Sequence, residues 1–183
     1  MKKLSLYCSA FLIIAATACD NPKTEKDSTS DEVEQNLEAE SYPIMDNNYM
    51  GMQPGDKIKA HKKILAKGQV KEGGNTLEVY KIEHEGQEVG YIIPNPTNNK
   101  LIGQIRITSP KAVSPDGLRV GSTYGQLIEI YPGIEIRSAD IGENIYAFQD
   151  NLAYRLEYLE NADGSDNYEI PVDVKIVQIE IWR

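Results

Sequence analysis

Histidines and oxygen-rich loops are the first places in this chain where catalysis or metal binding could reside. The chain has two histidines, His61 in a lysine-rich stretch and His84 beside Glu85, and neither has a second His or Cys at metal-site spacing. Residues 163–167 are rich in oxygen ligands, but Gly164 does not stand where an EF-hand needs its glycine, and no Glu follows at the twelfth position. We therefore expect two surface histidines, a polar turn at 163–167, and no metal or other cofactor.

Serines and carboxylates offer no clear nucleophilic or acid–base motif either. No Gly-x-Ser-x-Gly context surrounds any of the candidate serines, which are Ser109, Ser114, Ser122 and Ser138. Gly117 and Gly121 are not followed by the Gly-Lys-Ser/Thr ending of a phosphate loop. A hydrolase could use a carboxylate pair such as Asp116 and Asp140, but in so acidic a chain spacing alone selects no pair. We expect no catalytic residue, and a hydrolase acting on envelope material is the alternative.

Cysteine chemistry is confined to the first 19 residues of the chain. Cys8 lies in a segment with Lys2 and Lys3 at its start, an apolar run over 4–15, and small residues at 16–18, which is the layout of a secretory leader. The apolar run is too short to cross a bilayer, which takes about 20 residues. The rest of the chain has no thiol after Cys19, so its folded part cannot contain a disulfide or a thiolate metal site.

The segment Ala16-Thr17-Ala18-Cys19 resembles the lipobox of bacterial lipoproteins, with Ala16 at the position that usually holds Leu. The resemblance implies cleavage before Cys19 and a diacylglyceryl group on its thiol, with a further acyl chain on the new amine. Two or more acyl chains anchor a protein stably. We expect a cell-envelope protein held to a membrane through Cys19, at the outer rather than the inner membrane, with its domain outside the cytoplasm. The alternative is a secreted protein with a cysteine near its cleavage site.

An acidic tether is predicted between the anchor and the folded domain, over residues 19–46. Residues 20–46 contain nine Asp or Glu against two Lys, and few are apolar. Such a composition favours an extended, disordered spacer. The whole chain has a formal net charge of −9, the wrong sign for binding nucleic acid phosphates or, peripherally, anionic lipid headgroups.

The strongest internal pattern is a match at an offset of 74 residues, between residues 100–107 and 174–181. Both segments contain Ile, Gln, Ile and Ile at equivalent places, and in both the apolar residues change parity between the first Ile and the second. That change predicts a β-bulge or a strand buried on both faces. We predict two pseudo-repeated units, 54–108 and 116–183, in one α+β domain over 47–183. Each unit would be a helix followed by antiparallel strands.

Within the units, local signals predict individual elements. Ile58, Ile64 and Leu65 could share a helical face over 57–67, with Gly68 as its cap. Residues 76–83 and 87–93 read as a hairpin. Thr123 and Gln126 have capping-box spacing before a second helix that stops at 132–133. Strands follow at 134–137, 145–148 and 152–158, with a turn at 150–151 between the last two.

The stretch 117–131, followed by Tyr146-Ala147-Phe148 and the terminal Ile-rich strand, is similar to a pattern in small exported bacterial lipoproteins. Over 56–183 the chain resembles the uncharacterised sigma-E-regulated lipoprotein family. In its second unit alone it more distantly resembles the outer-membrane assembly lipoproteins of the SmpA/OmlA type. The first resemblance implies an envelope lipoprotein without known chemistry, and the second implies a scaffold role in an outer-membrane complex. Neither transfers functional residues.

Aromatic residues are the remaining candidates for a binding surface, with eleven Tyr, two Phe and one Trp. Tyr124 and Tyr131 fall on the second predicted helix, and Trp182 ends the last strand. An exposed indole there would anchor a partner or cover the sheet edge. We therefore predict a non-catalytic binding or assembly domain that contacts an envelope protein or a cell-wall polymer at the cleft between the two units.

Overall fold

The protein is described by a computed structural model that covers residues 41–45, 47–138, 144–157 and 169–183. The predicted leader, most of the tether, Asp140 and residues 163–167 lie outside the described residues. Among the residues that are described, no helix has the length and apolar character to cross a bilayer.

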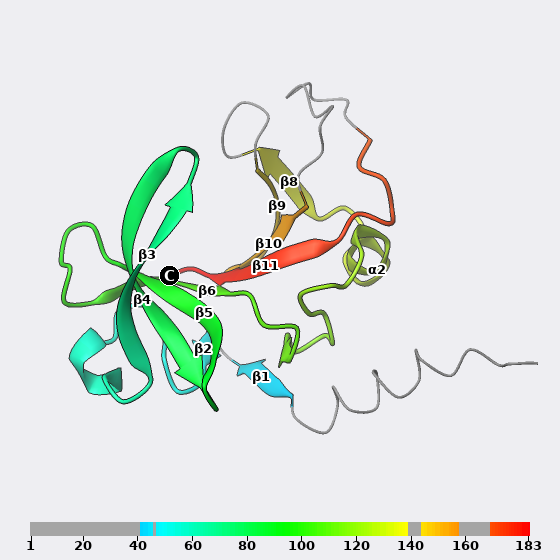
Figure 1. Cartoon of the computed structure of the whole chain (residues 1–183). Helices are drawn as coiled ribbons and strands as arrows, with labels where there is room; N and C mark the ends of the chain where they lie inside the picture. Colours follow the sequence, from blue (N-terminus) through cyan, green and yellow to red (C-terminus); the bar gives the residue numbers. More distant parts are fainter. Residues whose placement is uncertain (1–40, 46, 139–143, 158–168) are drawn as a thin grey trace, which may run out of the picture.

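Eight strands form one antiparallel sheet in the order β3-β4-β5-β6-β11-β10-β9-β8 (Figure 1). Their bounds are β3 Leu65–Glu72, β4 Asn75–His84, β5 Gln87–Pro94, β6 Ile102–Ile107, β8 Glu135–Ser138, β9 Ile145–Gln149, β10 Leu152–Leu156 and β11 Ile176–Ile181. A smaller sheet has the order β2-β1-β7, with β1 Tyr42–Met45, β2 Asn48–Tyr49 and β7 Ala112–Val113. The first described strand, β1, lies within the last residues of the predicted tether.

Helical structure in the described residues is limited to a 3-10 turn, η1 (Ile58–His61), and one α-helix, α2 (Tyr124–Ile130). The predicted capping box of α2 is confirmed: the Thr123 hydroxyl accepts from the Gln126 N–H at 3.1 Å, and the Gln126 side-chain oxygen accepts from the Thr123 N–H at 2.8 Å. The helix buries Leu127 against the core and ends just before Pro132, as predicted.

The predicted fold class is wrong. We expected an α+β domain of two units, each a helix followed by strands, but the described residues are mostly strand and α2 is their only α-helix. Residues 57–67 contain only the single turn of η1 before β3 begins. Gly68 does not cap a helix: it lies inside β3, where a Cβ would come within 2.8 Å of the Lys81 side chain that crosses it.

Strand burial explains why the helical interpretation of the first segment failed. Along β3, Ala66, Gly68 and Val70 are half-buried while Lys67 and Gln69 are exposed, which is a two-residue period. The helical spacing of Ile58, Ile64 and Leu65 arose from residues on either side of a turn, and the alternation that follows was the better signal.

Several predictions of strands and turns are confirmed. The hairpin of β4 and β5 turns at Glu85-Gly86, and β9 and β10 turn at Asp150-Asn151. The two matching Ile-rich segments form β6 and β11, which pair directly with each other. Each of these strands has one residue without a partner, Gly103 in β6 against β5 and Val177 in β11 against β10, and the pairing register shifts by one there. Both strands are buried on both faces. The parity change in the sequence therefore marks a β-bulge.

The large sheet is curved rather than flat. β3 and β10 are five positions apart in the strand order, which would separate them by about 24 Å in a flat sheet. However, Arg155 Nη1 on β10 lies 3.5 Å from Glu72 Oε1 on β3. The hairpin of β3 and β4 must therefore bend over the middle of the sheet, as Figure 1 shows. We call the side enclosed by this curve the inner face and the other side the outer face.

Cross-strand pairing assigns different chemistry to the two faces. Residues opposite one another in antiparallel strands share a face. Ile92, Ile105 and Ile181 thus line the outer face, where they join the hydrophobic core with α2 and the small sheet. Tyr91, Arg106 and Glu180 lie opposite one another on the inner face.

Candidate functional site

A cluster of buried polar side chains occupies the inner face where β6 and β11 pair. Gln104 and Arg106 alternate with isoleucines along β6, and Gln178 and Glu180 do the same along β11. Arg106 pairs directly with Glu180, so the matching sequence segments bring one amide and one charge from each strand onto the same face. All four residues are buried.

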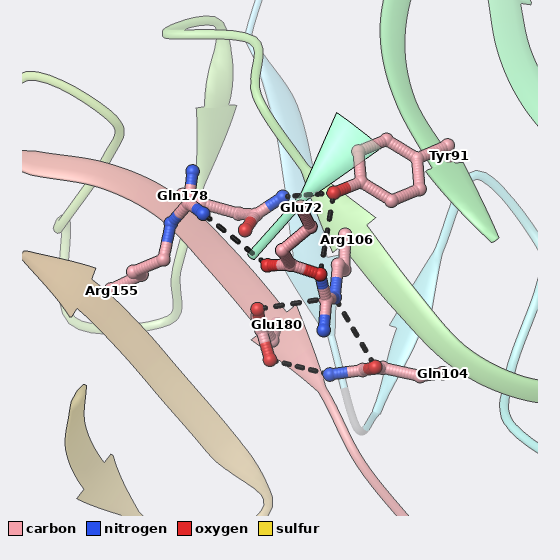
Figure 2. A network of polar contacts seen from close by, with 7 residues as sticks. All are labelled: Glu72, Tyr91, Gln104, Arg106, Arg155, Gln178 and Glu180. Carbon is pink, nitrogen blue, oxygen red and sulfur yellow. Dashed lines mark hydrogen bonds and ion pairs between the residues drawn. The ribbon is translucent and has the colours of Figure 1, made fainter. Parts of the chain in front are cut away.

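Arg106 is the centre of this polar cluster (Figure 2). Its Nε lies 3.2 Å from Glu180 Oε1 and donates to Gln104 Oε1 at 3.2 Å. Its Nη1 donates to Glu72 Oε2 and, at 3.4 Å, to the Tyr91 hydroxyl. One guanidinium therefore connects two carboxylates, an amide and a phenol from four different strands.

The remaining members close the cluster on either side of Arg106. The Gln104 amide donates to Glu180 Oε2, and the Gln178 amide donates to the Tyr91 hydroxyl at 3.1 Å. Arg155 approaches Glu72 from β10 (Figure 2). Two arginines thus face two glutamates, so the cluster has no excess formal charge.

Burial and neighbouring charges shift the pKa values of this cluster in opposite directions. Burial raises the pKa of Glu180 to about 7 even though Arg106 and Arg155 lower it. Burial also lowers the pKa of Arg106, but Glu180 and hydrogen bonds to Tyr91 and Glu72 together raise it above its ordinary value. Burial, with the nearby Glu180, raises the pKa of Tyr146 to about 12. Arg106 is therefore always charged, while Glu180 changes its charge near neutral pH.

The cluster has a structural consequence for the centre of the sheet. β6 and β11 pair over only three residue pairs, which is a short ladder. A slip of one residue would move Glu180 to the opposite face and leave Arg106 without its partner. Buried ion pairs contribute little net stability compared with apolar residues, but they can specify one arrangement. We expect the Arg106–Glu180 pair to fix the register in which the two halves of the sheet join.

A hollow of about 330 Å³ adjoins the cluster on the inner face. It lies between the end of the β3–β4 hairpin and β9, over the central strands, and Glu72 and Arg106 form part of its lining. The rest of the lining is largely aromatic and amide, and includes Asn75, Asn144, Tyr146, Phe148 and Trp182. We call this the inner hollow.

The exposure of the aromatic rings in the inner hollow differs. Trp182 is 42% exposed and Phe148 is half-buried, whereas Tyr146 is buried. The Tyr146 and Phe148 ring centroids are 6.0 Å apart, and the Arg137 guanidinium carbon lies 4.9 Å from the Phe148 centroid. The hollow therefore offers indole and phenyl surface to a ligand beside a cluster whose charges already pair with one another.

The three aromatic residues predicted for binding do not come together. Trp182 lines the inner hollow, but Tyr124 and Tyr131 are half-buried on and after α2, where they pack against the core. The Tyr131 hydroxyl donates to Asp116, and burial with that hydrogen bond raises the pKa of Tyr131. Asp140 lies outside the described residues, so the carboxylate pair that it would form with Asp116 is not placed.

The two histidines lie apart from the inner hollow. His61 Nε2 is 3.2 Å from Asp56 Oδ2, and the His84 and Tyr42 rings make a T-shaped contact with centroids 4.7 Å apart. Both are half-buried rather than fully exposed. The described part of the chain contains no group of three or more His, Cys, Asp or Glu that could hold a metal ion.

Sequence reasoning missed most of the residues at this site. It identified Trp182, but it used the Ile-rich segments only as a repeat and did not consider Gln104, Arg106, Gln178 and Glu180 as a set. The available signal was the alternation of these polar residues with isoleucine in both segments. Glu72 and Phe148 had no comparable signal, because their place at the site depends on the curvature of the sheet.

Comparison with known proteins gives a match for the fold alone. No protein-family model matches the chain, and no curated protein matches it significantly. A crystal structure of the uncharacterized protein YfeY from Escherichia coli is similar, with a TM-score of 0.50 and 14% sequence identity. The similarity covers 71% of this chain and 90% of that one. At that identity the match supports the arrangement of strands and says nothing about a ligand.

Proposed function

We propose that this chain is a membrane-anchored lipoprotein of the bacterial envelope whose sheet domain binds its partner without catalysis, and that the inner hollow is the binding site. The observation that carries the proposal is the lining of the hollow, where accessible aromatic surface lies beside amides and an internally paired charge cluster.

The lining favours a ligand that is polar but uncharged at the point of contact. Arg106 already binds two carboxylates, and Glu72 already faces two arginines, so a charged ligand would have to displace existing ion pairs. Such displacement is costly when a partner is left buried and unpaired. An apolar ring face with hydroxyl or amide groups at its edge would instead pack on Trp182 and Phe148 and bind Asn75.

A saccharide unit of a cell-wall polymer has this chemistry, because its ring carries C–H groups on its faces and hydroxyls on its edge. At about 330 Å³ the inner hollow is near the lower end of ligand-binding pockets, which span roughly 300–1,000 Å³. It fits one or two units of a polymer rather than a whole folded surface. We propose the polymer as the partner and treat an envelope protein as the other outcome of the experiment.

Catalysis by the cluster is disfavoured by the position of Glu180. This carboxyl has the pKa of a possible general acid, but its side chain is 0% exposed and lies behind Arg106, away from the lining of the hollow. A general acid must reach the reacting atom directly or through one water. The cluster is therefore better suited to shaping the hollow than to hydrolysis.

The single tryptophan provides a direct test of binding. Trp182 is the only Trp of the chain and lines the inner hollow, so its fluorescence reports on occupancy. We expect soluble disaccharide-peptide fragments of cell-wall peptidoglycan to shift its emission in a saturable way. Phe148→Ala should weaken this binding about tenfold or more, because it removes one of the ring surfaces.

The matched control for Phe148 is Tyr124→Ala, another half-buried aromatic that lies on α2. It should leave the titration unchanged. Equal loss from both variants, or release of new reducing ends from the fragments, would contradict a non-catalytic site at the hollow. If no fragment binds, and an envelope protein is retained by the parent and Tyr124→Ala but not by Phe148→Ala, the hollow is a protein-binding site.

The anchor is tested separately by Cys19→Ser. Lipidation requires the Cys19 thiol, so this variant should leave the membrane fraction and become extractable without detergent. Mass spectrometry of the N-terminus of the parent should find acyl groups on Cys19. An unmodified thiol at that position, or equal membrane retention of Cys19→Ser, would remove the anchoring half of the proposal while leaving the hollow experiments intact.

A further inference from the structure

We infer a second ligand site on this domain: a lysine-lined groove beside η1 that binds the phosphate of an anionic amphiphile. The groove is separate from the inner hollow and shares none of its lining residues. Tyr80 of its lining pairs with Ile92, an outer-face residue, so the two sites belong to opposite faces of the sheet. The inference does not depend on lipidation of Cys19.

Backbone contacts hold the two walls of the groove together. The Ile58 N–H donates to the Lys100 carbonyl at 2.9 Å, and Lys57 pairs with Leu101 across the same junction. The wall that carries Lys100 is itself fixed, because the Asn95 side-chain oxygen accepts from the Asn98 N–H at 3.0 Å. In Figure 1, η1 accordingly lies beside the β5–β6 loop. The groove is therefore part of the folded framework.

Four lysines line this groove, which has a volume of about 530 Å³. Lys57, Lys59 and Lys62 come from η1 and its ends, and Lys100 comes from the opposite wall. All four are exposed. The groove therefore carries four positive charges on a chain with a net charge of −9.

These lysines are available to a ligand. None of the four makes an ion pair with a described residue, in contrast to Lys81, whose Nζ lies 2.7 Å from Glu88 Oε2. The nearest acid in sequence, Asp56, is engaged elsewhere: its Oδ2 lies 3.2 Å from His61 Nε2 and accepts from the Gln53 N–H at 3.1 Å. The mutual repulsion of the four ammonium groups would be relieved by an anion.

The floor of the groove indicates that the anion has an apolar part. The rest of the apolar lining is Ile58, Leu65, Tyr80 and Leu101, of which Ile58 is buried and the others are half-buried. Lysine ammonium groups hold phosphate as point charges, and the Asn98 and Asn99 amides add hydrogen-bond donors at the rim. A phosphate head over the lysines with hydrocarbon on this floor matches both parts of the lining.

The overall negative charge of the chain does not prevent such binding. At physiological ionic strength, exposed charges more than about 8 Å apart are largely screened from one another. A phosphate in the groove therefore responds mainly to the four nearby lysines.

The experiment uses the chain with Cys19→Ser, so that a lipid anchor contributes nothing to vesicle binding. Cosedimentation is measured with vesicles of phosphatidylcholine alone and with vesicles containing 30% phosphatidylglycerol. We expect binding only to the anionic vesicles. Because one lysine near an anionic surface is worth about 1 kcal/mol, Lys62→Gln/Lys100→Gln should weaken binding roughly 10- to 30-fold.

Two comparisons make the result specific. Lys71→Gln/Lys175→Gln removes the same charge from exposed lysines outside the groove, and it should bind within about twofold of the parent. Equal weakening by both double variants would overturn the groove and indicate general attraction. Lysophosphatidylglycerol should compete for the groove and glycerol phosphate should not. Equal competition by glycerol phosphate would overturn the amphiphile, leaving a soluble phosphate compound as the ligand.

Discussion

The inner hollow and the lysine groove use charge in opposite ways. At the hollow, two arginines and two glutamates pair with one another and Glu180 is completely buried. At the groove, four exposed lysines pair with no described residue. We expect the charges in the first region to fix how the two halves of the sheet join, whereas the charges in the second are exposed to a ligand. The presence of charged residues in a cavity therefore does not by itself identify what the cavity binds.

The largest difference between the two regions is expected from Arg106→Ala. This change leaves Glu180 without its guanidinium partner and deprives Glu72 of one of its two arginines. Breaking a buried ion pair in this way should lower the free energy of unfolding by about 3–5 kcal/mol at pH 8, as measured by urea denaturation.

The control for that change is Arg137→Ala. Arg137 also forms an ion pair, with Glu135 at 2.7 Å, but both side chains are more than half exposed. Its removal should cost little stability, because exposed ion pairs are screened by water and contribute little. Similar losses from Arg106→Ala and Arg137→Ala would show that the buried cluster has no special role in the sheet.

The pH dependence of stability is the next largest expected difference between the two regions. Burial raises the pKa of Glu180 from 4.5 to about 7, so between these values the folded state holds a proton that the unfolded state has released. Stability should therefore fall as the pH rises from 5 to 8, by at most about 3 kcal/mol from this group. The amide in Glu180→Gln does not titrate, so this variant should lose less stability between pH 5 and pH 8.

The expected result for Glu180→Gln is stability close to that of the parent at pH 5 and higher than the parent at pH 8. Urea denaturation across this range measures both. The exposed Glu135→Gln serves as the control, because Glu135 is not part of the cluster and Arg137 lowers its pKa instead. A Glu180→Gln protein that is several kcal/mol less stable than the parent at pH 8 would contradict the raised pKa.

The difference between local and long-range contacts explains which features could be predicted from the sequence. Local signals predicted the hairpin over residues 76–93 and the capping box of Thr123, because each depends on neighbouring residues. The parity change in the two Ile-rich segments left open a β-bulge or a strand buried on both faces, and the structure places the bulges at Gly103 and Val177. The helix predicted at 57–67 failed because its apolar spacing spanned a turn, although the alternation around Gly68 favoured a strand. Contacts such as Arg155 with Glu72 depend on the curvature of eight strands and have no local signature.

The lysine groove illustrates the other limit of sequence reasoning. The sequence shows the run of lysines from Lys57 to Lys63 and predicts a helix there, but Lys100 joins them only through the pairing of η1 with the β5–β6 loop. The repeat in the sequence predicted two Ile-rich strands, but their pairing at the centre of the sheet and both cavities required the three-dimensional arrangement.

Salt should affect ligand binding differently at the two sites, with a smaller effect in free energy than that of Arg106→Ala or of pH on stability. Raising sodium chloride from 50 to 500 mM shortens the screening length from roughly 14 Å to roughly 4 Å. Vesicle binding by the groove should weaken tenfold or more, whereas the Trp182 titration at the hollow should change less than about twofold, because its contacts are uncharged. Salt sensitivity at the hollow would indicate that its ligand displaces Glu72 or Arg106 from the cluster.

The smallest expected effect is that of the groove lysines on folding. Lys62→Gln/Lys100→Gln removes exposed charges that pair with no described acid, so no buried partner is left unsatisfied. Removing two of four like charges also relieves some repulsion, so the change should stabilise the fold slightly. We expect the free energy of unfolding to stay within about 0.5 kcal/mol of the parent value in urea denaturation, with any shift upward. A loss comparable with that from Arg106→Ala would mean that these lysines hold η1 against the sheet, and the contrast between internal and available charge would no longer hold.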